Sequence, residues 1–164
     1  MYRILCDSYA LYDPRLPELF VFEPELTQKK NEPGELTFTI PKEHPNYGLL
    51  EKLKSRIKVY RDDTLIWVGR AIEDDRDLYE NRKVIAEGAL SFLLDSVLRP
   101  FTFDGTVTEL FTWILTAHNT QVNENQRLTL GNCDISGSVG VTTKDYLSSW
   151  QALKTCLLDS FGGY

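Results

Sequence analysis

The sequence predicts an α+β protein: a small, mostly antiparallel β-barrel followed by a segment that mixes helices and strands. Short β-rich runs bounded by turn residues fill the first part of the chain, and Glu35 to Ile40 alternates strictly between polar and apolar residues. Further on, Thr106 and Glu109 form a capping box that opens a helical apolar stripe. We therefore expect two domains, residues 1–98 and 99–164, the second an incomplete, truncated part of a following domain.

Short strands that end at Asp, Asn, Gly or Pro favour a small barrel or sandwich over a parallel α/β sheet. They are expected at Tyr2 to Leu5, near Phe20 to Glu23, and at Glu35 to Ile40, Arg56 to Arg61, Thr64 to Ile72 and Lys83 to Gly88. Asp62 and Asp63 predict a hairpin turn between two of these strands. The apolar run LSFLLDSVL is expected to be helical and to end before Pro100.

The second domain begins with a helix that the capping box predicts from Thr106 to Asn119. Short β-like pieces follow around Arg127 to Leu130 and Val139 to Thr143. Ser148 and Gln151 repeat the capping-box spacing and predict a second helix. The apolar stripe of this helix consists of Trp150, Leu153, Leu157 and Phe161. Gly162-Gly163 is expected to end the helix.

A helix that ends at Gly-Gly before a single aromatic residue is the usual approach to a further strand. We therefore expect the natural protein to continue beyond Tyr164.

Composition excludes several function classes. The formal net charge is −6, and the basic residues are interleaved with acidic and apolar ones, which disfavours a nucleic-acid clamp. The chain has no apolar run near the roughly 20 residues that cross a bilayer, and no secretory signal, so we expect no membrane partner and synthesis in the cytoplasm. The widely spaced cysteines, Cys6, Cys133 and Cys156, are read as reduced packing residues.

No residue pattern predicts a catalytic centre, a metal site or a cofactor. His44 lies between two prolines, where fixing a turn is the better explanation, and His118 is expected to cap the end of its helix. The adjacent pairs Asp74/Asp75 and Asp62/Asp63 are better explained by turns, because neighbours on a strand point to opposite faces and adjacency is poor evidence for an acid–base pair. Trp113 and Trp150 are assigned to the core, whereas an interface role is open for Trp67.

Several segments, taken in order, resemble a known family. They are NEPGELTFTIPKEHPNY, LKSRIKVYRDDTLIWVGRAI, EGALSFLLDSVLRP, TAHNTQV and SWQALKTCLLDSFGGY. Their order and spacing are similar to the N-terminal region of phage and prophage tail proteins, the tail-associated lysin or baseplate-hub group, also called prophage tail endopeptidases. The resemblance covers nearly the whole chain and includes no catalytic motif.

The resemblance implies a virion structural role. In that family, barrel domains related to tail-tube proteins form a homotrimer that closes the distal tube and leaves a passage for DNA. Lytic or host-binding modules lie further toward the C-terminus, so this region is expected not to be an enzyme. The implied location is the virion tail tip after synthesis in the host cytoplasm. The implied partners are the distal tail and tail-tube proteins and passing DNA, which is not bound specifically.

A DNA passage favours an acidic lining, because like charge keeps the duplex moving. The hypothesis is that Glu73, Asp74, Asp75 and Asp77 line or flank such a lumen, and that Trp67 lies at a subunit interface. Two alternatives stay open: part of a peptidoglycan hydrolase, or a host-glycan-binding module that uses Tyr9, Tyr12 and Tyr79.

Overall fold

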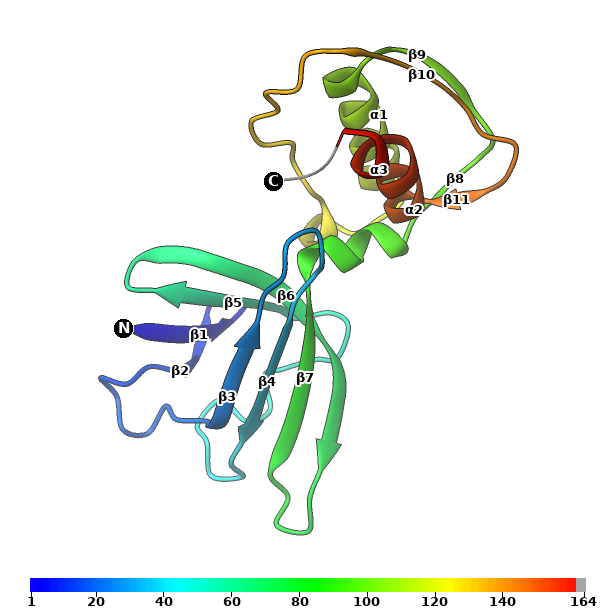
Figure 1. The fold of residues 1–164 in the computed structure, drawn as a ribbon. Helices are drawn as coiled ribbons and strands as arrows, with labels where there is room; N and C mark the ends of the chain where they lie inside the picture. The colour runs from blue at the N-terminus through cyan, green and yellow to red at the C-terminus, as the bar shows by residue number, and fades with distance from the viewer. Residues whose placement is uncertain (162–164) are drawn as a thin grey trace. The chain divides into compact units, whose positions relative to one another are not determined.

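The computed structural model describes residues 1–161, and the chain divides into two compact units, Met1–Ala89 and Leu90–Tyr164 (Figure 1). The α+β prediction is confirmed, since the first unit is a mostly antiparallel sheet curled into a half-barrel and short helices follow it. The division lies earlier than the boundary expected after Leu98. Among the described residues, no helix combines the length and apolar character that a membrane span requires.

One antiparallel sheet makes up the first unit, and its strands lie in the order β2-β1-β5-β6-β7-β4-β3. The strands are β1 (Tyr2–Cys6), β2 (Tyr9–Tyr12), β3 (Phe22–Thr27), β4 (Glu35–Ile40), β5 (Arg56–Arg61), β6 (Thr64–Arg76) and β7 (Arg82–Gly88). β4 and β5 have the predicted bounds, β6 continues past Ile72, and β2 was not predicted. β3 begins later than predicted and contains Pro24, which an edge strand tolerates because its outer side makes no ladder.

Bulges bend this sheet. The β6 strand pairs Val59 with Trp67 but Tyr60 with Leu65, so Ile66 is an extra residue. A second extra residue, Ile72, lies between the pairings of β6 with β7. Each bulge increases the local twist, and the long β6 strand carries both of them. The sheet therefore curls around its own apolar face while its edges, β2 and β3, remain unpaired with each other.

The core of the first unit fills the inside of the curl. β4 shows the predicted alternation, with Leu36, Phe38 and Ile40 buried. His44 closes part of this interior and is 4% exposed. One imidazole nitrogen, Nε2, lies 2.9 Å from the carbonyl oxygen of Leu11, and the backbone N–H of Asn46 donates to Nδ1 over 3.0 Å. The expectation that His44 fixes a turn is thus confirmed.

The second unit packs helices with short two-stranded pairs. Its elements are η1 (Ala89–Leu94), which starts one residue before the unit, β8 (Val97–Leu98), β9 (Thr102–Thr106), α1 (Val107–Asn119), η2 (Glu124–Gln126), β10 (Ser138–Thr142), β11 (Leu147–Ser148), α2 (Ser149–Leu153), η3 (Lys154–Leu158) and α3 (Asp159–Phe161). β9 pairs with β10, and β8 with β11. Both predicted capping boxes are present, Thr106 with Glu109 and Ser148 with Gln151.

Three predictions for this unit need correction. The run LSFLLDSVL is a 3₁₀-helix followed by strand β8, because Val97 and Leu98 pair with β11. Arg127 to Leu130 is not a strand: the side-chain amide of Asn119 bonds both the N–H and the carbonyl of Leu128, at 2.9 and 2.8 Å, in place of a neighbouring strand. Trp113 is 37% exposed and lies against Phe101, with 4.6 Å between ring centroids, instead of joining the core.

The second helix continues from α2 through one π-helical stretch, η3, to Phe161. Its apolar stripe reaches the core through Leu153 and Leu157, while Trp150 is half-buried against the same cluster. The predicted stop at Gly162-Gly163 lies outside the described residues.

A groove in the concave face of the half-barrel

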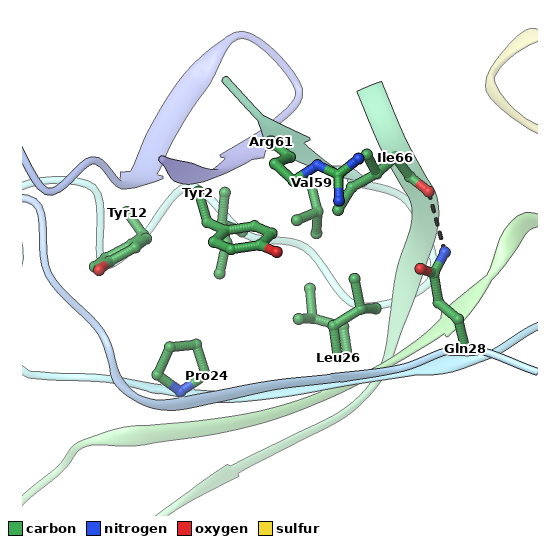
Figure 2. A pocket seen from close by; sticks show the side chains of 10 residues that line it. Tyr2, Tyr12, Pro24, Leu26, Gln28, Val59, Arg61 and Ile66 are labelled. Atoms are coloured by element: carbon green, nitrogen blue, oxygen red, sulfur yellow. Dashed lines mark hydrogen bonds between the residues drawn. The ribbon is translucent and has the colours of Figure 1, made fainter. Parts of the chain in front are cut away.

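A groove of about 530 Å³ lies in the concave face of the sheet of the first unit. Figure 2 shows Tyr2, Val59 and Arg61 on one side and Pro24, Leu26 and Gln28 on the other. These residues come from β1 and β5 on one arm of the curl, and from β3 and the residue that follows it on the other arm. The groove is therefore the part of the interior that the curled sheet leaves open.

Strand alternation places these side chains in the groove. Tyr2 is in phase with the buried Ile4 on β1, and Arg61 is in phase with the buried Val59 on β5. Tyr2 and Arg61 lie at the ends of their strands, where this face extends beyond the core and contacts solvent. Tyr2 is therefore 53% exposed. The floor of the groove is apolar and its mouth is polar and aromatic, a composition typical of binding surfaces.

Arg61 supplies the one formal charge of the groove lining. Its guanidinium makes no hydrogen bond or ion pair with any residue that the structure describes, whereas the neighbouring Arg3 bonds both Asp62 and Asp63. Gln28 donates from Nε2 to the carbonyl oxygen of Ile66 over 3.1 Å, which leaves its own carbonyl oxygen free to accept (Figure 2). The groove can thus accept an apolar group together with a hydrogen-bonding or anionic group.

Trp67 lies outside this groove, in the core of the first unit, and is 6% exposed. Its indole packs against backbone without side chains: a methyl group added at Gly69 would lie 2.3 Å from the ring, and one at Gly88 would lie 2.9 Å from Nε1. Nε1 donates to the carbonyl oxygen of Pro33 over 3.3 Å. Trp67 therefore packs within its own unit, and its burial leaves little surface for the subunit interface that the sequence left open.

The four acidic residues proposed for a lumen do not share one surface. The bulge at Ile72 turns Asp74 inward, whereas Glu73 and Asp75 are exposed. Asp77 lies in the β6–β7 turn, where its carboxylate accepts from the backbone N–H groups of Tyr79 and Asn81 at 2.8 and 2.9 Å. The hydrogen bond from the side-chain amide of Asn81, together with these two backbone bonds, lowers the pKa of Asp77. Two of the four carboxylates are thus engaged in local structure.

Asp74 belongs to a buried ion pair with Arg82. The Nε and Nη2 atoms of Arg82 donate to the two carboxylate oxygens of Asp74, at 2.9 and 2.5 Å. Arg82 also donates to the backbone carbonyls of Tyr47 and Leu50, and its guanidinium lies 5.3 Å from the centre of the Tyr47 ring. The hydrogen bond to Asp74 raises the pKa of Arg82. This network attaches the loop before β5 to the β6–β7 hairpin.

A second polar cluster lies inside the second unit. The Nδ1 atom of His118 lies 2.7 Å from the hydroxyl of Ser96, which in turn lies 2.7 Å from the hydroxyl of Ser149. Nε2 of His118 bonds the carbonyl of Gln126 at 3.1 Å, so His118 does not cap the end of α1 as expected. All three side chains are buried, which keeps a substrate away from this serine–histidine contact and gives the cluster a structural role.

The chain has a structural likeness to a known phage protein. No protein-family description and no curated protein matches the chain. The chain is similar to the solved structure of the prophage tail protein gp18 from Listeria monocytogenes EGD-e, with a TM-score of 0.45 and 13% sequence identity. The match covers 74% of this chain and 35% of that one, so the chain spans about a third of the length of that protein.

Sequence reasoning missed the groove and its residues. Of the tyrosines proposed for glycan binding, Tyr12 lines the groove, whereas Tyr9 and Tyr79 are exposed elsewhere. The available signal was alternation, since Tyr2 and Arg61 continue the buried faces of their strands. The alternation did not predict that β3 lies opposite β1 and β5. That arrangement results from the curl of the sheet, which depends on bulges.

Proposed function

We propose that this chain is a structural subunit of a phage or prophage tail and that, within the tail, it belongs to the baseplate hub that closes the distal tube around a passage for DNA. The order and spacing of the segments that resemble the tail-associated lysin and baseplate-hub group motivate the proposal. Those segments include β4, β5 and most of β6 in the curled sheet, and the end of α1 and the second helix in the second unit. The proposed partners are further copies of the chain, as a homotrimer, and the distal tail and tail-tube proteins.

One observation carries the proposal: part of the concave face of the half-barrel, the groove, is left open. A sheet that leaves apolar side chains and an unpaired guanidinium in an open groove is typical of a protein that docks onto another. A structural subunit of an assembly meets this requirement directly, because its neighbours cover surfaces that the isolated chain exposes.

Immunogold electron microscopy tests the tail location. Particles are collected from cells that encode the chain after prophage induction, and are labelled with antibodies against it. The proposal predicts gold at one end of the particle tail. Gold that is absent from intact tails, with the chain found only in the unassembled cell fraction, contradicts it. The trimer is tested separately by light scattering, which is expected to give about 57 kDa, three times the 18.9 kDa of one chain.

The lumen hypothesis is retained for Glu73, Asp75 and Asp77, which are exposed, and is withdrawn for Asp74, whose carboxylate is paired with Arg82. Reversing the exposed charge of Glu73, as Glu73→Lys, is expected to slow DNA ejection because a cationic group in the lining retains phosphates. Unchanged ejection by particles that carry this substitution would remove the hypothesis.

A second candidate function is glycan binding, favoured by the two phenol rings of Tyr2 and Tyr12 in one groove with the polar groups of Gln28 and Arg61. Aromatic faces stack on sugar rings while planar polar groups bond their hydroxyls. Titration with host cell-wall glycan fragments, followed by NMR shifts of the Tyr2 and Tyr12 rings, tests it. Shifts that are confined to other residues exclude the groove.

A further inference from the structure

The turn between β6 and β7 displays two large apolar side chains to solvent. Leu78 is 99% exposed and Tyr79 is 80% exposed, although apolar side chains of this size normally find cover. The β6–β7 hairpin projects at the lower end of the first unit in Figure 1. We call Leu78 and Tyr79 together the tip. Single exposed apolar residues are common on proteins, but two neighbours at the end of a hairpin form a local patch.

The backbone beneath the tip is held firmly. Asp77 accepts from the backbone of Tyr79 and from the backbone and side chain of Asn81, and its own N–H donates to the Asn81 carbonyl at 3.0 Å. Tyr47 donates from its hydroxyl to the carbonyl of Glu80 at 2.5 Å. Lys42 forms an ion pair with the Glu80 carboxylate, also at 2.5 Å, which raises the pKa of Lys42.

A rigid backbone under exposed apolar side chains lowers the entropic cost of binding. Little backbone freedom remains to be lost when Leu78 and Tyr79 enter a pocket, and tyrosine is among the residues enriched in binding hot spots. The hairpin behind the tip carries charges of both signs. Glu73 and Asp75 are exposed on it together with Arg76 and Lys83, so it offers no cationic cluster to a phosphate-bearing surface.

We infer that the tip of one copy of this chain docks into the concave groove of a second copy. The groove has an apolar floor that includes Leu26 and Val59, and its volume of about 530 Å³ suits a leucine and a tyrosine side chain. It also contains the guanidinium of Arg61, which is opposite in charge to the exposed carboxylate of Asp75, the residue across from Lys83 behind the tip. The apolar tip thus matches the apolar floor of the groove, and Asp75 is opposite in charge to Arg61.

This contact joins two different surfaces of the chain. The tip belongs to the β6–β7 turn, whereas the groove lies between β1, β5 and β3, so the interface is heterologous and each copy offers one tip and one groove. A heterologous contact produces a closed ring when its rotation closes. The inference deepens the proposed function and rests on it for its biological setting, since it names the surfaces through which tail subunits would form the proposed trimer.

A complementation experiment tests the inference. The tip variant carries Leu78→Ser and Tyr79→Ser, and the groove variant carries Arg61→Glu and Leu26→Ser. A control variant, Leu16→Ser with Tyr9→Ser, removes a leucine and a tyrosine that are 43% and 52% exposed and line no part of the groove. Light scattering over a range of concentrations gives the mass of each, and near-ultraviolet circular dichroism shows that each is folded.

The unmodified chain and the control variant are expected to assemble, and each of the other variants alone is expected to remain at 18.9 kDa. An equal mixture of the tip and groove variants is expected to form a dimer, because one intact tip and one intact groove remain between them. The inference is overturned if the unmodified chain is monomeric, if either variant assembles alone, or if the mixture does not associate. The tail location is tested separately by immunogold labelling of whole particles, so these outcomes do not affect that proposal.

Discussion

The side-chain amide of Gln28 donates to the backbone carbonyl of Ile66 over 3.1 Å, although β4 and β7 separate the strand that Gln28 follows from β6 in the sheet. This hydrogen bond joins the two arms of the curl at the edge of the groove (Figure 2). Ile66 is also the extra residue of a bulge in β6. The irregularity that bends the sheet therefore exposes the carbonyl that holds the bent sheet together.

Loss of this bond is expected to loosen the end of β3. Gln28→Ala removes the donor and should lower the free energy of unfolding of the first unit by about 0.5–1.5 kcal/mol, the net value of one hydrogen bond. Gln28→Glu keeps the shape but removes the donor, and should act similarly. Hydrogen exchange at the Leu26 amide is expected to accelerate in both variants. Unchanged exchange at Leu26 would show that the two arms are held by packing alone.

Arg82 and Asp74 are expected to behave as a coupled pair. Arg82→Ala leaves a partly buried carboxylate and two backbone carbonyls without their donor, so it should cost about 3–5 kcal/mol of stability. The double variant Arg82→Met with Asp74→Leu should be more stable than Arg82→Ala, since no uncompensated charge remains. Urea unfolding of Arg82→Met, Asp74→Leu and the double variant measures the coupling. Additive losses would contradict it.

The glycines beneath Trp67 are expected to resist substitution. A methyl group at Gly88 would lie 1.7 Å from the carbonyl oxygen of Pro33, and one at Gly69 would lie 2.1 Å from that of Glu87. Both neighbours are backbone atoms, so Gly69→Ala and Gly88→Ala should each destabilise the first unit by at least about 1–3 kcal/mol. Gly48→Ala is the matched control, because nothing lies within 4 Å of the added methyl group. Thermal unfolding compares the three variants.

The stability of the first unit is expected to depend on pH through His44. Burial, as the largest cause, lowers the pKa of His44 below its ordinary 6.5, so the folded state binds fewer protons than the unfolded chain between these two pKa values. The contribution is complete above pH 6.5 and is lost as the pH falls toward the folded pKa. An NMR titration of the His44 ring should give a midpoint below 6.5. A midpoint above that value would contradict the account.

Much of the secondary structure was predictable because it depends on local signals. The alternation of Glu35 to Ile40 and the capping box at Thr106 predicted β4 and α1 with their observed bounds or close to them. Local sequence patterns did not predict the structure of segments whose hydrogen-bonding partners are distant in sequence. β8 is a strand only because β11 pairs with it, and the segment around Leu128 is not one because Asn119 satisfies its backbone.

The candidate site was less predictable than the fold. The groove forms because bulges curl the sheet, and nothing in the local pattern around Ile66 or Ile72 marks a bulge. The same bulge separates Asp74 from its exposed neighbours and removes it from the acidic set that adjacency had grouped together. Trp67 was open to an interface role because the apolar run around it does not show which face is inward. The glycines that lie against its ring, Gly34, Gly69 and Gly88, come from three parts of the chain, so no local pattern marks its burial.

The most direct measurement of the central claim is the position of the chain in whole particles. Immunogold labelling of induced particles is predicted to place gold at the distal tip of the tail, with the same particles carrying DNA-filled heads. Gold that is missing from the tails, or scattered along heads and debris, would contradict a role in the baseplate hub. Labelling along the whole tail would keep the tail role and contradict the hub.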